Sequence, residues 1–247
     1  MKILDRISIY YLVIAFLLSL YVLGTLTFGM QKVLLQALPA VLATVVSGVI
    51  LDYIELKRWT KPLTPLITGL IIGLVAQFGE STLNLALIGL AAMAVKFLVK
   101  WDGRHIFNPA ASGLFLGMFL GSYPSWWVGG EFVWIYLIWI PILLYKMRRW
   151  APMIGFLTPV AIFSGISIFT SSSALFFTSI MLIEPKTSPA TIKLGLIYGA
   201  VVAAGYLILG RFFQFDPLVP SLLIGNLILR LRSVSILNEI EEMKLKY

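Results

Sequence analysis

The chain has 247 residues, of which 60% are hydrophobic and 12% charged, and its mean hydropathy is +0.96. Soluble domains carry about 25% charged residues, so this composition excludes an ordinary soluble domain and predicts an integral membrane protein. The net charge is +8, cysteine is absent and one histidine is present. This excludes disulfides and iron–sulfur ligation, and argues against zinc, haem or any other metal site of the usual kind.

The first half of the chain contains five apolar segments, and the third and fifth are short. These predicted helices cover residues 7–29, 33–54, 65–78, 83–99 and 109–121. A helix needs about 20 residues to cross a hydrocarbon core of about 30 Å, so the two short segments cannot cross unaided. The first segment is too long for the apolar core of a cleaved signal peptide. We expect these five helices to form one repeat over residues 1–121.

Residues 122–230 repeat this order of long and short segments. The predicted helices cover residues 132–145, 151–169, 173–183, 193–210 and 219–229. Small residues at wide helical spacing, Gly195, Gly199 and Gly205, predict close helix packing. A charged, amphipathic tail over residues 231–247 is expected to be cytoplasmic. The pattern therefore predicts an all-α membrane protein with ten transmembrane segments in two five-helix repeats.

Two polar stretches indicate that the halves are copies of each other. Gly-Arg-His-Ile-Phe-Asn-Pro at residues 103–109 has an imperfect counterpart in Gly210, Arg211, Phe215, Asp216 and Pro217. The apolar residues after each proline match at the same offset of 108 residues. Because five crossings is an odd number, the second half must be inverted relative to the first.

The distribution of basic residues supports this topology. With a cytoplasmic N-terminus, all of the 19 lysines and arginines except Lys32 and Arg211 fall on the cytoplasmic side. We therefore expect a multi-pass protein of the cell membrane with both termini in the cytoplasm. The basic links are orientation signals, and nucleic acid is not an expected partner. Aromatic residues after the fifth segment suit a belt at the outer interface, namely Tyr123, Trp126, Trp127 and Trp134.

The short segments carry the candidate site. Unpaired backbone groups cost several kcal/mol in hydrocarbon, so half-length helices survive only beside protein or a water-lined cavity. Asn108 and Asp216 are placed as N-caps, with Pro109 and Pro217 at the first helical position. The positive helix ends would favour an electron-rich or anionic group. Taken alone, each Asn/Asp-Pro pair is explained by the start of a helix, whereas the duplication favours a shared central site.

A second polar cluster, Glu-Pro-Lys-Thr-Ser-Pro-Ala-Thr at residues 184–191, is expected on the same cytoplasmic side. Glu184 is either an interfacial carboxylate or a group that holds a ligand or pairs with Arg104. His105 is a satisfied interfacial histidine, a hydrogen-bonding partner of a ligand, or a proton carrier. No catalytic triad, paired carboxylates, Walker loop or dinucleotide fingerprint occurs in a suitable context, so no residue is expected to be catalytic.

These two stretches, followed by Gly195, Ile197, Tyr198 and Gly199, resemble a known family. It is the family of membrane proteins shared by the Na⁺-translocating NADH:quinone oxidoreductase, where the member is NqrB, and the Rnf electron-transport complex, where it is RnfD. The resemblance covers nearly the whole chain. It implies an inverted-repeat fold related to urea and ammonium channels, flavin in a transmembrane electron path, and partner subunits of an Rnf/Nqr-like complex.

The resemblance also has departures. The family links flavin mononucleotide (FMN) to a threonine in the outer link after the fifth segment, but residues 122–131 contain no threonine. Covalent FMN is therefore not expected. Only six residues precede the first predicted helix, so the family's N-terminal extension is not expected, and the family's usual aspartate before the proline is Glu184 here. What the resemblance leaves is a noncovalent flavin, riboflavin or FMN, at the cytoplasmic side.

The resemblance implies a set of candidate flavin-binding residues: Arg104, His105, Phe107, Asn108, Glu184, Thr187, Ser188 and Asp216. Arg104 would donate to flavin carbonyls, Asn108 and Thr187 would orient the ring, and the helix beginning at Pro109 would supply a positive field. On this reading Arg104→Ala loses the flavin.

Three functions remain open. The first is a flavin-binding electron-transport protein, at most an electron-carrying subunit of a redox-driven ion-translocating complex. The second is a transporter or channel for a small solute, such as a flavin, because inverted repeats with half-helices are a transport architecture. The third is a structural subunit with an empty site. A homo-oligomer is compatible with all three.

Overall fold

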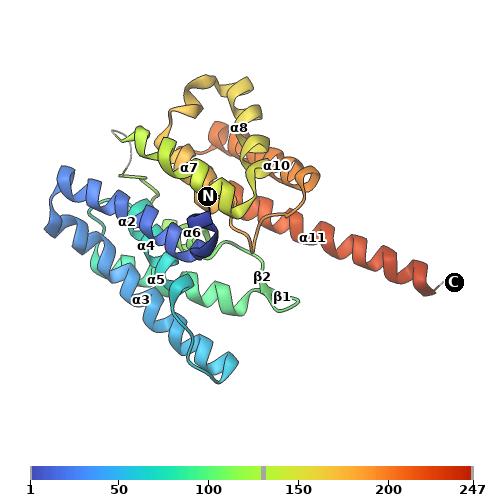
Figure 1. The fold of residues 1–247 in the computed structure, drawn as a ribbon, viewed down its shortest axis with the longest axis horizontal. Coiled ribbons are helices and arrows are strands. Elements are labelled where there is room, and N and C mark those ends of the chain that lie inside the picture. The colour runs from blue at the N-terminus through green and yellow to red at the C-terminus, as the bar shows by residue number, and fades with distance from the viewer. Residues whose placement is uncertain (1, 129–131, 246–247) are drawn as a thin grey trace.

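The computed structural model describes residues 2–128 and 132–245, with side chains for residues 4–128 and 132–231. The described chain is almost entirely helical (Figure 1). In the first half the elements are α1 (Lys2–Arg6), α2 (Ile9–Phe28), α3 (Met30–Leu56), α4 (Leu63–Val75), α5 (Thr82–Leu98), the strands β1 (Lys100–Trp101) and β2 (Arg104–His105), and α6 (Pro109–Met118).

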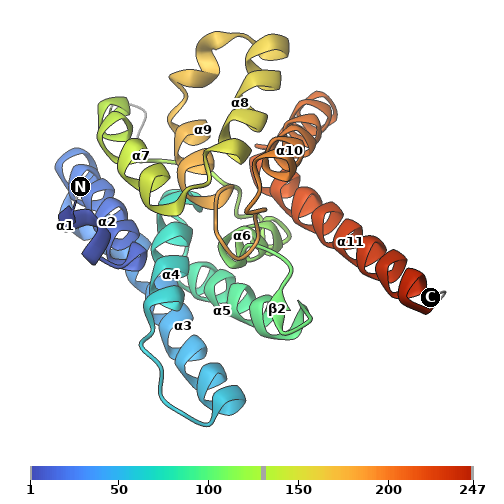
Figure 2. The same ribbon diagram turned by 45° about the vertical axis from the view of Figure 1, so that its right-hand side comes forward.

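The second half contains α7 (Val133–Met147), α8 (Trp150–Ser164), the 3₁₀ turn η1 (Ile166–Phe169), α9 (Ser172–Phe176), the π-helix η2 (Phe177–Met181), α10 (Ile192–Phe212) and α11 (Leu218–Leu245). Every apolar segment expected from the sequence coincides with a helix of this series. Short elements that were not expected are α1, the β1–β2 hairpin and the π-helical character of η2. α11 continues through residue 230, so the expected tail prolongs this helix and projects from the body of the molecule (Figures 1 and 2).

The helices have the apolar surface of a membrane protein. Among the described residues, α2, α3 and α10 are long and apolar enough to cross a bilayer. On α3 an exposed apolar stripe recurs every four residues, at Leu34, Leu38, Leu42, Val46, Ile50 and Ile54. A soluble protein would place polar side chains on such a face, whereas hydrocarbon accepts it.

Glycines allow the long helices to approach closely. A Cβ added to Gly199 of α10 would collide with backbone atoms of Pro152, Gly155 and Phe156 in α8. A Cβ at Gly195 would lie 2.9 Å from Ala151 Cβ, and one at Gly205 would lie 3.3 Å from Ser221 Cβ. The three glycines that predicted close packing therefore lie at helix contacts, as expected.

Aromatic rings join the two halves. Phe16 of α2 packs against Tyr136 and Trp139 of α7, with ring centroids 5.8 and 5.7 Å away, and against Phe176 of α9 at 6.2 Å. These contacts bury Phe16 and Tyr136 completely.

The expected outer aromatic belt is wrong for two of its residues. Trp126 is only 8% exposed, and its Nε1–H donates to the Asp216 carboxylate. Trp127 is half-buried and donates to the carbonyl of Gly73 at 2.8 Å. Both indoles find their hydrogen-bond acceptors inside the protein, whereas Tyr123 and Trp134 are exposed.

Candidate functional site

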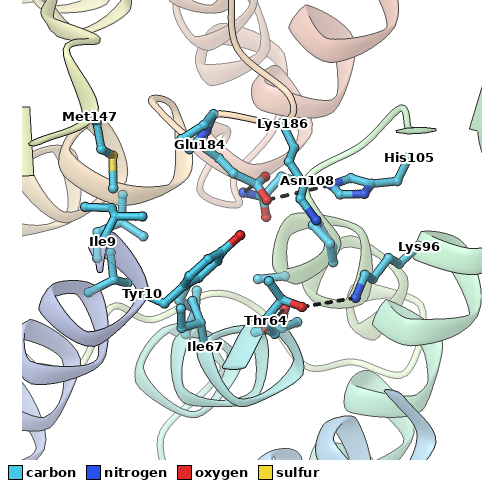
Figure 3. A pocket seen from close by; sticks show the side chains of 17 residues that line it. Ile9, Tyr10, Thr64, Ile67, Lys96, His105, Asn108, Met147, Glu184 and Lys186 are labelled. Carbon is cyan, nitrogen blue, oxygen red and sulfur yellow. Dashed lines mark hydrogen bonds and ion pairs between the residues drawn. The ribbon is translucent and has the colours of Figure 1, made fainter. Parts of the chain in front are cut away.

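A cavity of about 180 Å³ lies where helix ends from both halves meet (Figure 3). The beginnings of α2 and α4, the ends of α5, α7 and η2, and the first residues of α6 enclose it. Its wall is mostly apolar, with polar groups from several elements: Tyr10, Thr64, Thr68, Lys96, His105, Asn108, Glu184 and Lys186.

The hairpin and α6 place the first polar stretch at this cavity. Asp102 and Gly103 adopt φ angles of 51° and 69°, which turn the chain back between β1 and β2. Asn108 then caps α6, since its Oδ1 accepts from the N–H of Ala111 at 3.0 Å and Pro109 occupies the first helical position. The N-cap predicted from the sequence is therefore present.

The Asn108 side chain also reaches the second polar stretch. Its Nδ2 donates to Glu184 Oε2 at 3.0 Å and lies 3.4 Å from the Met181 carbonyl. Thr187 Oγ1 donates to the same carboxylate oxygen at 2.9 Å, and Ser188 Oγ donates to the Glu184 carbonyl at 2.8 Å. Four predicted residues, from stretches 76 positions apart, thus form one hydrogen-bonded network. Glu184 is bonded to Asn108 and Thr187 in this network, whereas Arg104 was the expected partner.

Asn226, which the sequence analysis did not single out, extends this network into α10 and α11. Its Oδ1 accepts from the backbone N–H of Asn108 at 3.0 Å, and its Nδ2 donates to Tyr198 Oη at 2.7 Å. Nδ2 also lies 3.3 Å from the Thr187 carbonyl. Because Asn226 is 2% exposed, these bonds satisfy a fully buried amide. Its position as a polar residue within an apolar run was the available signal.

His105 faces Glu184 without a hydrogen bond. Its Nε2 lies 3.7 Å from Glu184 Oε1 and has no hydrogen-bond partner among the described residues. The histidine is only 8% exposed. A buried polar atom without a partner is costly, so a water or ligand atom between these two groups would stabilise the site.

Two lysines of the cavity wall, Lys96 and Lys186, were interpreted from the sequence only as signals of membrane orientation. Lys96, in the last turn of α5, is 8% exposed, and its Nζ lies 3.4 Å from Thr64 Oγ1. Lys186 is exposed at the cavity. In Figure 3 the side chains of Lys96, Lys186 and Tyr10 converge on the space beside Glu184. Lys96 could have been noticed as the charged residue within an otherwise apolar predicted helix.

Five predicted residues are not among those that line this cavity. Thr187 and Ser188 contact Glu184, which does line it, whereas Arg104, Phe107 and Asp216 lie elsewhere. Arg104 is exposed on β2, because consecutive strand residues point to opposite sides and His105 takes the inner one. Phe107 lines a separate, apolar cavity of about 770 Å³ between α5, α6, α10 and α11. Asp216 lines a third cavity of about 530 Å³, where its Oδ1 accepts from the Leu218 N–H at 2.8 Å. The two predicted N-caps therefore lie at different cavities, and α11 begins at Leu218, one residue later than the expected Pro217.

Arg149, in the link between α7 and α8, binds the polar stretch at residues 184–191 through Ser188. Its guanidinium donates to the Ser188 carbonyl and lies 3.3 Å from Ser188 Oγ. Partial burial lowers the pKa of Arg149 from its ordinary value, but an arginine remains charged at neutral pH. This arrangement fixes the loop that carries Glu184 and Thr187.

The described residues contain no group of three or more His, Cys, Asp or Glu side chains that could hold a metal ion. No family model and no curated protein matches this sequence.

Proposed function

We propose that this chain is a flavin-binding membrane electron-transport protein, similar to NqrB and RnfD, which holds riboflavin or noncovalent FMN. The observation that carries the proposal is the meeting of its two polar stretches at one cavity. Asn108 from the first stretch and Thr187 from the second both donate to Glu184 Oε2, and Asn108 and Glu184 line the cavity.

The packing of the helices supports the ten-segment inverted repeat that belongs to this proposal. α3 packs on α5 and α5 on α6, just as α8 packs on α10 and α10 on α11. Corresponding helices also meet across the halves, α2 with α7 and α6 with α11. Inverted repeats of this kind place their sites where interrupted helices meet.

The cavity suits one end of a flavin. Its volume is below the range of about 300–1,000 Å³ that encloses a drug-sized ligand, so a ring edge would enter while the ribityl chain stays at the mouth near Lys186. The unpartnered His105 Nε2 and the free side of Glu184 offer polar contacts to that edge. A bound flavin would supply electron transfer, whereas the protein binds, orients and electrostatically tunes it.

The proposal is tested by the absorption spectrum of protein purified in a mild detergent, before and after addition of riboflavin or FMN. We expect a near-stoichiometric flavin band that bleaches with dithionite, and complete release of the flavin on denaturation because no covalent link holds it. A colourless protein that takes up neither flavin would contradict the proposal.

Two variants locate the flavin. Glu184→Ala removes the carboxylate from the cavity wall and should lower flavin occupancy at least tenfold. Arg104→Ala, on the exposed side of β2, should retain the flavin, which reverses the expectation from the sequence. Size-exclusion profiles of both variants control for folding, and flavin loss from the Arg104 variant alone would place the site elsewhere.

A second candidate function is a transporter or channel for a small solute. Its support is the third cavity, lined by Arg211, Gln214 and Asp216 where α10 ends and α11 begins. Ala174 lines the third cavity and Ile180 the first, and along the chain between them lie Phe176 and Phe177. Their ring centroids are 5.8 and 6.4 Å from that of Trp126. Uptake of radiolabelled riboflavin into liposomes by a colourless protein would favour transport over electron transfer.

We also propose where the protein lies and what it assembles with. A multi-pass location in the cell membrane with cytoplasmic termini follows from the distribution of basic residues. Other subunits of an Rnf/Nqr-like complex, or further copies of the chain, would supply the electron donor and acceptor.

A further inference from the structure

Lys96 is a buried charge without a direct ion pair among the described residues, because the carboxylates of Asp52 and Glu184 attract it only from beyond 4.0 Å. Its side chain ends at the cavity, and its one hydrogen bond to the part of the chain that the structure describes, to Thr64 Oγ1, is long at 3.4 Å. Among the described residues, no carboxylate lies within 4.0 Å of its Nζ, which sits 5.1 Å from the Phe97 ring centroid. An ammonium group carries three donors, and burying it unpaired is costly. Such a group is retained where something else supplies the negative charge.

A comparison with Lys100 shows that a position near the end of α5 does not by itself explain why Lys96 is buried. Lys100 also lies over the Phe97 ring, at 4.7 Å, but its side chain is 24% exposed and forms an ion pair with Glu55. A topology signal needs only a cation at the membrane surface, and Lys100 fulfils that role. Lys96 points inward instead, toward Thr64 and the cavity (Figure 3).

The other charges of the wall leave the cavity positive. Lys96 and Lys186 contribute two positive charges and Glu184 one negative charge, so the wall carries a net formal charge of +1 with His105 neutral. Glu184 uses Oε2 for Asn108 and Thr187, while Oε1 faces only the distant His105 Nε2. A ligand could therefore donate an N–H to Oε1 and place negative charge near Lys96.

We infer that the cavity selects planar heterocycles that are anionic on the edge reaching Lys96 and that carry an N–H donor for Glu184. This inference rests on the proposed function in that flavin is its first test case. The pyrimidine ring of flavin has an N–H between two carbonyls. When the oxidised ring takes up two electrons, here from dithionite, and one proton at N5, it becomes an anion with its charge at N1 and the adjacent carbonyl oxygen. Lys96 would stabilise that form.

The experiment compares the affinities of oxidised and dithionite-reduced riboflavin in wild type, Lys96→Met and Lys100→Met by anaerobic equilibrium dialysis. Riboflavin is chosen because it lacks a phosphate that could bind lysine elsewhere. We expect wild type and Lys100→Met to bind the reduced form at least tenfold more tightly, equivalent to about 30 mV in the two-electron potential. In Lys96→Met the two affinities should agree within a factor of about two, and Lys96→Arg should restore the preference.

The melting temperature of the ligand-free variants separates ligand recognition from a structural role. Removing an unpaired buried ammonium should leave Lys96→Met as stable as wild type or more stable. Equal affinities for both forms in wild type, or a preference that persists in Lys96→Met, would overturn the inference while the flavin function stands.

If wild type binds neither form of riboflavin, the proposed function fails and the charge preference is tested with other heterocycles. Urate is a planar monoanion at neutral pH, and hypoxanthine is a neutral heterocycle of similar size. Urate should raise the melting temperature of wild type but not of Lys96→Met, and hypoxanthine should raise neither. Equal effects of the two compounds on wild type would overturn the inference.

Discussion

At the scale of single residues, Asn108 connects the fold with the site. Its Oδ1 caps α6, its Nδ2 donates to Glu184, and its backbone N–H donates to Asn226. The residue is 3% exposed, so these three hydrogen bonds are formed inside the protein. One amide therefore couples the start of a half-length helix to the polar wall of the cavity.

Replacing Asn108 should cost more than the loss of a helix cap. Asn108→Ala removes the cap and leaves the Glu184 carboxylate with one fewer donor, so we expect a loss of about 2–4 kcal/mol. Ser81→Ala is the matched control, because Ser81 caps α5 from an exposed position, and its loss should cost about 1 kcal/mol. Thermal unfolding in one detergent compares them, and equal shifts would show that the bond to Glu184 contributes little.

The residues of the site were predictable from sequence only where a local rule applied. Asn108 follows from N-cap chemistry, and Glu184 and Thr187 follow from a polar cluster within an apolar chain. Arg104 was expected in the site from the family resemblance, but it is exposed on β2 and does not line the cavity, and no pattern in the sequence indicated this strand. Lys96 and Asn226 were missed because their burial depends on contacts between distant helices.

At the scale of elements, α8 and α10 depend on glycine for their close contact. A methyl group on Gly199 would meet three backbone atoms of α8, which cannot rotate away as a side chain can. Gly210 lies in the same helix, but its added Cβ would be 3.5 Å from Pro217 Cγ, an ordinary contact. The two positions therefore form a natural pair for comparison.

Gly199→Ala should destabilise the protein by about 1–3 kcal/mol or more, since the helices must separate to admit the methyl group. Gly210→Ala should be neutral, or stabilising by up to about 1 kcal/mol, because alanine is the better helix former. Thermal stability in detergent and expression level check both variants. A Gly199 variant as stable as the Gly210 variant would mean that α8 and α10 are less tightly packed.

The long and short helices were predictable because apolar run length is a local property of the sequence. The places where these helices break or change to another helix type were less predictable. α8 was expected to continue to residue 169, but it ends at Ser164. Gly165 then adopts a φ of 96°, and the chain continues as η1. The π-helical turn η2 depends on packing around Phe177, Thr178 and Ser179, all completely buried, and no local rule anticipates it.

At the scale of the whole molecule, the proposed inversion of the two halves makes a prediction about sidedness. The link before α4 and the link before α9 occupy equivalent places in the two repeats, as do the links before α5 and α10. Inverted repeats place the members of each pair on opposite sides of the membrane. Parallel repeats would place them on the same side.

The chain contains no cysteine, so single cysteines can report this directly. In intact cells, a membrane-impermeant maleimide should label Gln77→Cys and Thr170→Cys but not Lys61→Cys or Ala190→Cys, all of which replace exposed residues. Permeabilised cells should label all four. Labelling of Lys61→Cys and Thr170→Cys on the same side would refute the inverted arrangement.

The π-helical turn η2 also determines where the carboxylate of the site points. A π-turn holds an extra residue compared with an α-helical turn, and each residue of a helix rotates the chain by about 100°. Deleting one residue between Phe177 and Met181 would therefore swing Glu184 about a quarter of a revolution away from Asn108. The number of residues in this turn therefore determines the direction of the Glu184 side chain. The polar contacts of the cavity depend on that number as much as on the identity of the five residues.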